Sequence, residues 1–340
     1  MIGKLLSLAC ACAMLLCAGS AFADTVTIRY SSWLPTSHWY VASNIVPYLE
    51  EIETVTEGRV KVDILPKTVG TPQSQFDVVH DGLADMSWIV VGYTPGRFTL
   101  AEMGELPLTG DTTSTGPAFH RLYMQHFAGA GEFDGVALLA VYTGSAGHVA
   151  TRGKKVQAVA DFKGLKLRSA SNAATEALNL LGAVPILKSA AETFELLSTG
   201  AIDGSLMIPE TVVSANGIDF LDSFTVVPDG LFNTVHATIV NQDKWNEIAP
   251  EDQKAILAIS GESLARTVGE SYARENAEAF EAMKAKGYAI DTLSPEEGAR
   301  LKTVLAPVEQ KWIDAARQKG IADPAAVLAE LRAASAKAGD

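Results

Sequence analysis

The segment GLKLRSASNAATEALNLLGAVPIL, residues 164–187, carries the pattern that decides the fold. A short apolar strand that ends at Arg168 is followed by a stretch at helical spacing from Asn172 to Leu181 and by an apolar strand from Val184 to Leu187. The same rhythm of helix and strand continues to Ile208. Strands that alternate with helices form βαβ units, so this part of the chain predicts a mainly parallel sheet covered by helices.

The chain before this segment has the same rhythm. Residues Val26 to Trp33 are rich in β-branched and aromatic residues, Ser37 to Thr56 have helical spacing, and Val60 to Leu65 alternate as a strand does. The wholly apolar run from Met86 to Val91 is typical of a strand buried on both faces of a parallel sheet. We therefore expect this N-terminal part of the chain to form a separate α/β lobe.

Three parts follow from these patterns. We expect lobe I at residues 24–147, lobe II at 148–235, and a return strand followed by long C-terminal helices that brace both lobes at 236–340. The chain would pass between the lobes near Thr143 to Val149 and again near Thr234 to Val240, which makes these two stretches the predicted hinge.

The C-terminal third is predicted to be helical. Helical spacing runs from Pro250 to Lys286, from Ser294 to Lys319 with an interruption at Pro307, and from Pro324 to Ala336. Ser294 followed by proline and two glutamates is a strong helix start, because serine can cap the free N–H groups and glutamate favours the positive end of the helix.

The first 23 residues have the pattern of a signal peptide. Lys4 precedes an apolar run from Leu5 to Ala18, and Ala21-Phe22-Ala23 is a typical cleavage site, so the chain would be exported and its mature form would begin at Asp24. A membrane anchor would need about 20 apolar residues, which this run does not reach. A lipid anchor on Cys17 is disfavoured by the bulky leucine before it.

Composition excludes several classes of function. The 340 residues include 27 Lys and Arg against 40 Asp and Glu, a formal net charge of −13, which disfavours nucleic acid as a partner. The three cysteines, Cys10, Cys12 and Cys17, lie in the predicted signal peptide, so we expect no disulfide, catalytic thiol or zinc–thiolate site. The sequence also lacks the common nucleophile, phosphate, dinucleotide and zinc-protease motifs, and its six histidines are too dispersed for an obvious metal site, so these residues indicate no catalytic, cofactor or metal site.

Aromatic and basic residues gather where the predicted strands end. Trp33 and Trp88 end or follow two of these strands, and His38 comes shortly after Trp33. Arg168 ends its strand directly before a helix, so a guanidinium and the positive end of a helix lie together, as carboxylate capture requires. Ligands in open α/β sheets bind beyond the carboxyl ends of the strands. Core packing for the tryptophans and a solvated ion pair for Arg168 are the alternatives.

A family resemblance rests on three motifs. These are Gly164 to Arg168 with the helix after it, the segment from Gly92 to Phe98 with Glu105-Leu106-Pro107, and Gly200-Ala201-Ile202-Asp203-Gly204. Together with the signal peptide, their order and spacing resemble the substrate-binding proteins of TRAP transporters of the DctP type. The resemblance implies a two-lobe periplasmic binding protein, not an enzyme, with a ligand cleft between the lobes. Such a receptor closes on a small organic acid and delivers it to membrane permease subunits driven by an ion gradient.

The resemblance also implies site residues. Arg168 would form a bidentate pair with the ligand carboxylate, and His148 stands in the region where the family often has a second basic ligand, which leaves a second strong anion contact open. The stretch from Ser205 to Glu210 departs from the family pattern, so Met207 would make the wall more apolar and Glu210 could accept from a hydroxyl or an amine. We therefore expect a keto, hydroxy or aromatic acid. Further candidates on the return strand are Phe232, Asn233 and His236.

Two other functions remain open at this point. An aromatic and acidic box of Trp33, Trp88, Tyr93 and Glu210 would bind a small amine or amino alcohol by cation–π contacts. An exported hydrolase on a similar scaffold would need paired carboxyls, for which Glu102, Glu105 and Glu210 are candidates.

Overall fold

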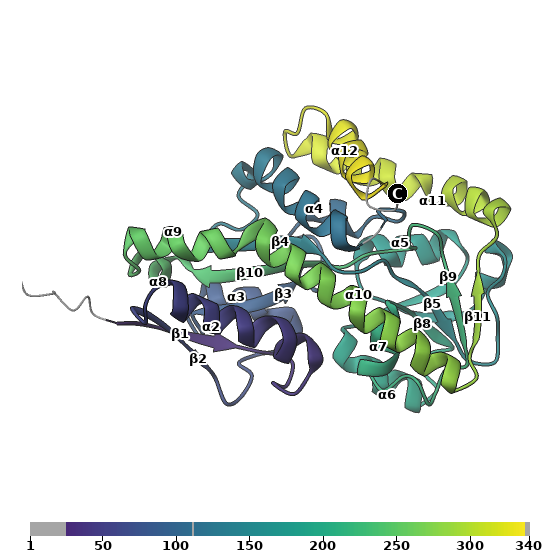
Figure 1. Ribbon diagram of the computed structural model, residues 1–340. Coiled ribbons are helices and arrows are strands. Elements are labelled where there is room, and N and C mark those ends of the chain that lie inside the picture. Colours follow the sequence, from purple (N-terminus) through teal and green to yellow (C-terminus); the bar gives the residue numbers. More distant parts are fainter. Residues whose placement is uncertain (1–24, 111, 337–340) are drawn as a thin grey trace, which may run out of the picture.

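Two mixed sheets organise the chain (Figure 1), whose computed structural model describes residues 25–110 and 112–336. The sheet of lobe I has the order β2 (Val60–Ile64), β1 (Val26–Ser31), β3 (Met86–Val90), β10 (Val235–Asn241) and β4 (Val136–Thr143). The sheet of lobe II has the order β11 (Ala289–Thr292), β9 (Ser223–Val226), β5 (His148–Thr151), β8 (Gly204–Met207), β6 (Lys166–Ser169) and β7 (Val184–Leu187).

Each sheet is parallel except for one antiparallel strand, the first strand that the chain forms after it crosses from the other lobe. In lobe I, β1 pairs in parallel with β2 and β3, and β10 runs antiparallel to both β3 and β4. In lobe II, β6 pairs in parallel with β7 and β8, and β5 runs antiparallel to both β8 and β9. The predicted α/β class with two lobes is confirmed, and β3 is buried along its whole length as its apolar sequence indicates.

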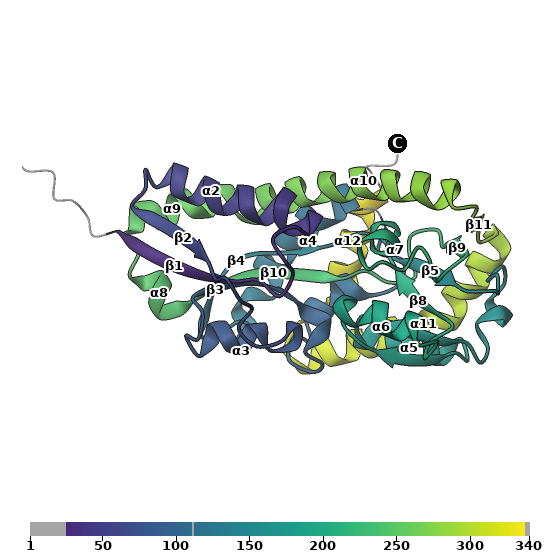
Figure 2. The same cartoon turned by 90° about the horizontal axis from the view of Figure 1, so that it is seen from below.

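Helices cover the sheets and connect the lobes. Those of lobe I are the π-helical η1 (Val41–Ile45), α2 (Val46–Val55), α3 (Gln75–His80) and α4 (Thr112–His126), and those of lobe II are α5 (Asn172–Leu180), α6 (Thr193–Ser198) and α7 (Pro209–Ser214). The C-terminal helices are α8 (Gln242–Asn246), α9 (Pro250–Ile259), α10 (Gly261–Ala285), α11 (Pro295–Gln318) and α12 (Pro324–Ala336). Helix α10 contacts α4 and β4 as well as α7, so it runs along both lobes (Figure 2). Among the described residues, no helix combines the length and apolar character needed to cross a membrane.

Two crossing segments connect the lobes and hydrogen-bond to each other. One joins β4 to β5, the other joins β9 to β10, and they meet in an antiparallel bridge between Gly147 and Phe232. The N–H of Gly144 also donates to the carbonyl of Thr234 at 2.7 Å. The first crossing lies within the predicted range Thr143 to Val149. The second lies at residues 227–234, between β9 and β10. The range predicted for it, Thr234 to Val240, is wrong, since it is almost entirely strand β10.

The C-terminal third differs from its prediction in three ways. The helix predicted from Pro250 to Lys286 is divided into α9 and α10, because Ser260 between them has an extended backbone. Helix α11 continues through Pro307 without a break, and Leu305 and Val308 on either side of the proline are buried, so packing outweighs the lost backbone hydrogen bond. The residues before this helix form β11, which was not predicted and which adds a parallel edge strand to the sheet of lobe II. The helix start at Ser294 is confirmed, since its side chain accepts from the N–H of Glu297.

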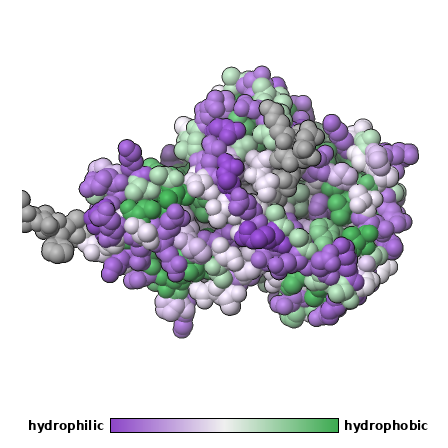
Figure 3. All heavy atoms as spheres, viewed as in Figure 1, coloured by the Kyte–Doolittle hydropathy of each residue, from purple (hydrophilic) through white to green (hydrophobic). Residues whose placement is uncertain are grey.

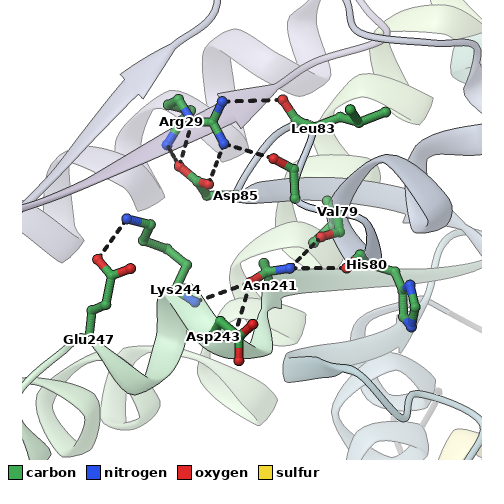
Figure 4. A network of polar contacts seen from close by, with 10 residues as sticks. Arg29, Val79, His80, Leu83, Asp85, Asn241, Asp243, Lys244 and Glu247 are labelled. Atoms are coloured by element: carbon green, nitrogen blue, oxygen red, sulfur yellow. Dashed lines mark hydrogen bonds and ion pairs between the residues drawn. The ribbon is translucent and has the colours of Figure 1, made fainter.

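An equivalent aspartate fixes a turn in each lobe. The carboxylate of Asp85, just before β3, accepts from the backbone N–H of Arg29 on β1 at 2.8 Å and forms a two-point ion pair with the Arg29 guanidinium (Figure 4). Asp203, just before β8, accepts from the backbone N–H of Lys166 on β6, also at 2.8 Å. Both turns therefore tie the start of a central strand to its parallel neighbour.

Candidate ligand-binding site

A cavity of about 300 Å³ lies between the lobes and is lined by residues of both. It sits at the carboxyl ends of β1, β3, β6 and β8, where ligands of open α/β sheets bind. All the ligand residues predicted from the sequence line it except His148 and Asn233. The lining residues among them are Trp33, His38, Trp88, Arg168, Met207, Glu210, Phe232 and His236.

Stacked aromatic rings form the wall that lobe I contributes. The rings of Trp33 and Trp88 stack with centroids 4.8 Å apart and planes at 8°, and Tyr40 stacks on Trp88 at 4.3 Å. The ring of Tyr93 meets Trp33 edge-on at 5.9 Å. These side chains belong to the hydrophobic core of lobe I, so the wall is rigid and continuous with that core.

Two histidines on this side of the cavity are held neutral by burial. His236 meets the Trp88 ring edge-on at 5.0 Å, and burial lowers the pKa of its imidazole to about 3. Its ring nitrogens contact Thr234 and Tyr40, at 3.0 and 3.4 Å. Burial also lowers the pKa of His38. Neither imidazole supplies positive charge to the cavity near neutral pH.

Arg168 is the charged group that lobe II places in the cavity. It lies near the end of β6, where its Nε donates to the carbonyl of Lys188 at 2.8 Å and the side chain of Tyr93 lies nearby. Burial lowers its pKa, but an arginine begins so far above neutrality that it stays protonated. No ion pair found in the described part of the chain includes Arg168. The Arg168 guanidinium is therefore an oriented, desolvated cation without an ion-pair partner among the described residues.

Glu210 has a different environment. Its carboxyl group accepts hydrogen bonds from Thr211, Ser214 and Trp39, each at 2.7 Å. Burial raises its pKa, and these hydrogen bonds only partly oppose that effect. Because Trp39 belongs to lobe I and Glu210 to α7 of lobe II, the bond between them joins the lobes beside the cavity.

The structure does not bring His148 and Asn233 to the cavity. The Nδ1 atom of His148 accepts from the backbone N–H of Val227 at 3.2 Å, and burial lowers the pKa of this imidazole to about 4. The amide oxygen of Asn233 accepts from the backbone N–H of Thr234, which turns the fully buried side chain toward the crossing segment. Both side chains hold backbone in place, and a neutral His148 cannot replace a second basic ligand.

Comparison with known proteins identifies the family. Residues 33–315 match the description "Bacterial extracellular solute-binding protein, family 7", also called DctP. The chain belongs to this family. The match covers most of both lobes and much of the helical third, and it confirms the resemblance found in the sequence.

Several known proteins are similar over nearly the whole chain. A TRAP periplasmic solute binding protein from Bordetella bronchiseptica, solved with bound (R)- and (S)-mandelate, is 35% identical with a TM-score of 0.88, covering 92% of this chain and 99% of that one. A TRAP solute binding protein from Rhodoferax ferrireducens with copurified benzoate is 25% identical with a TM-score of 0.85, covering 93% and 99%. A Comamonas testosteroni protein named TsaT, an outer membrane transporter protein, is 27% identical over 88% of this chain and 89% of its own length.

Some lining residues were not predicted. Tyr272 comes from the middle of α10 and Phe194 from α6, and both reach the cavity of this solute-binding protein from elements that the sequence pattern describes only as amphipathic helices. Tyr40 belongs to a helical turn whose apolar spacing indicates core packing. No short-range signal distinguishes these aromatic residues from core residues, because their position depends on how the lobes meet.

Proposed function

We propose that this chain is the periplasmic receptor of a TRAP transporter for a small aromatic carboxylate. The observation that carries the proposal is the pairing of Arg168, a buried cation without an ion-pair partner among the described residues, with the aromatic wall of Trp33 and Trp88. A guanidinium binds a carboxylate through two parallel hydrogen bonds, and the flat wall suits an aromatic ring.

The size of the cavity and the ligands of similar proteins support this class of ligand. A volume of about 300 Å³ lies at the lower end of the range for ligand pockets, which favours a small acid. Mandelate and benzoate, bound in the two similar structures described above, both join a carboxylate to one aromatic ring. Met207 and Phe232 add apolar surface on the other sides of the cavity.

The biological setting is proposed with the ligand. Residues 1–23, which lie outside the described residues, would direct export and be removed after Ala23. Residues 24–147 and 148–235 would form the two lobes, with β11 added to the second, and would close on the acid. The closed receptor would deliver the acid to membrane permease subunits driven by an ion gradient.

The two alternative functions have less support. The carboxyl group of Glu210 already accepts three hydrogen bonds, which leaves little capacity for an amine. For a hydrolase, Glu102 and Glu105 would have to face Glu210 across the cavity. Glu102 instead hydrogen-bonds to Asn172, and Glu105 is fully buried outside the cavity lining.

A thermal-shift panel tests the proposed function. Mandelate, benzoate, glucuronate and benzylamine are added separately to the purified mature chain, at about 100 times the dissociation constant where binding allows. We expect the aromatic acids to raise the unfolding midpoint by about 3–6 °C.

Variants of Arg168 give the test its specificity. Arg168→Ala should weaken acid binding at least about 30-fold, because the ligand carboxylate would be buried without its partner. Arg168→Lys should retain part of the affinity, since it keeps the charge and loses the two-point geometry. Arg152→Ala is the matched control, because Arg152 also binds backbone carbonyls of lobe II, outside the cavity lining. A shift with benzylamine alone, or equal binding by Arg168→Ala, would contradict the proposal.

A further inference from the structure

Tyr93 lies where the two lobes meet around Arg168. It ends a short 3-10 turn, η3 (Val91–Tyr93), that directly follows β3, and its side chain lines the cavity from lobe I. The sequence leaves open which residue assists Arg168, and the structure places His148 away from the cavity. Tyr93 is a polar side chain of lobe I that lines the same cavity as the guanidinium.

The hydroxyl group of Tyr93 already accepts a hydrogen bond from lobe II. It comes from the backbone N–H of Ala190 at 2.8 Å, and Tyr93 and Arg168 line the same cavity. A phenol oxygen that accepts a hydrogen bond keeps its own proton, so the O–H is available to donate to a ligand. No hydrogen bond donated by Tyr93 is found within the part of the chain that the structure describes.

We propose that Tyr93 is the second member of the anion subsite and donates its O–H to the ligand carboxylate beside Arg168. This inference rests on the proposed function, because it requires an anionic ligand on Arg168. The hydroxyl belongs to lobe I, while the backbone N–H of Ala190 that donates to it and Arg168 belong to lobe II, so the complete subsite exists only when the lobes are together. Tyr93 thereby couples carboxylate capture to closure of the receptor.

The backbone beside Tyr93 is fitted to this role. A Cβ atom on Gly92 would lie 2.6 Å from the Cβ of Ser171 and 2.9 Å from the carbonyl oxygen of Ala170, and both of these residues follow the strand that carries Arg168. The absence of a side chain at Gly92 lets lobe I approach this segment closely. The edge-on contact with Trp33 fixes the Tyr93 ring at the same time.

Rapid-mixing measurements of tryptophan fluorescence with benzoate and mandelate test the proposal. Tyr93→Phe keeps the ring and removes the hydroxyl. We expect it to raise the rate of ligand dissociation about tenfold and to change the association rate little, because the lost hydrogen bonds form only in the closed complex. The control is Tyr48→Phe, which should dissociate at the wild-type rate, because Tyr48 is a buried tyrosine of lobe I outside the cavity lining and its hydroxyl contacts Ser260.

A second variant removes the N–H of Ala190, which donates to Tyr93, instead of the Tyr93 hydroxyl. Ala190 begins the 3-10 turn η7 (Ala190–Glu192) after an extended Ser189, a position that accepts proline, so Ala190→Pro deletes the N–H with little change of backbone. We expect faster dissociation in this variant, and no further increase when it is combined with Tyr93→Phe.

The outcomes separate the two proposals. If the wild-type chain binds neither acid, the proposed function fails. If the wild type binds, Arg168→Ala loses binding and Tyr93→Phe dissociates at the wild-type rate, the inference about Tyr93 is overturned while the proposed function stands. Additive effects of Tyr93→Phe and Ala190→Pro would overturn the coupling between the lobes.

Discussion

Arg168 takes its role from the place where its strand ends. Two backbone carbonyls, those of Lys188 and Leu206, and the phenol of Tyr93 surround the guanidinium, so its direction is fixed by groups that carry no charge. The sequence predicted this residue because the strand, the arginine and the following helix N-terminus are adjacent in the chain. It could not predict Tyr93 as a partner, since the two residues meet only across the lobes.

At the same scale, Glu210 gives the site a pH dependence. Burial raises the pKa of this carboxyl, so it loses its proton at a higher pH than an exposed glutamate does. The resulting negative charge in the cavity would repel an anionic ligand. We expect the dissociation constant for benzoate, measured by titration calorimetry, to increase as the pH rises from 5 to 8, and Glu210→Gln to flatten this profile. Neither His236 nor His148 contributes, because their pKa values of about 3 and 4 keep them neutral over this range.

A matched variant checks this interpretation. Glu102 is also a carboxyl whose pKa is raised by burial, but it does not line the cavity, so Glu102→Gln should keep the wild-type pH profile. Two results would contradict an effect of the Glu210 charge on binding. One is a benzoate dissociation constant that decreases toward pH 8, and the other is a Glu210→Gln variant with the same pH dependence of this constant as the wild type.

At the scale of elements, the sequence predicts most of the fold because the spacing of apolar residues within each strand and helix of a βαβ unit is a local property of the chain. The predicted strand up to Arg168 and the helix after it correspond to β6 and α5 within one or two residues. Strand β11 was missed because it is short, half-exposed and set between two long helices. The second crossing was placed too late because β10 mixes polar and apolar residues, so that no local pattern marks the point where the strand begins.

Gly147 tests the role of the crossing segments. Its N–H donates to the carbonyl of Phe232 at 2.8 Å, and a Cβ at this position would overlap the Phe232 ring, which lines the cavity. We expect Gly147→Ala to lower the free energy of unfolding by about 1–3 kcal/mol, as overpacking of a core does, and to weaken acid binding. Urea unfolding and calorimetry measure the two effects.

Gly298 supplies the control for that variant. It lies in α11, a Cβ there would meet nothing within 4 Å, and alanine is the better helix former, so Gly298→Ala should be neutral or slightly stabilising. A Gly147→Ala chain with wild-type stability and affinity would show that the close approach of the crossing segments does not shape the site.

At the scale of the whole molecule, contacts between the lobes turn two α/β units into one receptor. Trp39 bonds to Glu210, Tyr93 to Ala190, and Gln73 to Glu192 at 3.3 Å, each pair joining lobe I to lobe II. Hydrophilic and hydrophobic residues are interspersed on the face seen in Figure 3, while the buried Arg168 lies inside a chain of net charge −13. Capture therefore depends on the oriented groups of the cavity rather than on long-range attraction. How the lobes meet is a long-range property, which local sequence patterns do not encode.

The most direct measurement is a crystal structure of the mature chain grown with whichever of mandelate or benzoate gives the larger thermal shift. The account predicts the ligand carboxylate within hydrogen-bond distance of both the Arg168 guanidinium and the Tyr93 hydroxyl, with the aromatic ring against Trp33 and Trp88 in a closed cavity. A carboxylate bound away from Arg168, or a cavity without the acid in a protein that the acid stabilises, would contradict the central claim.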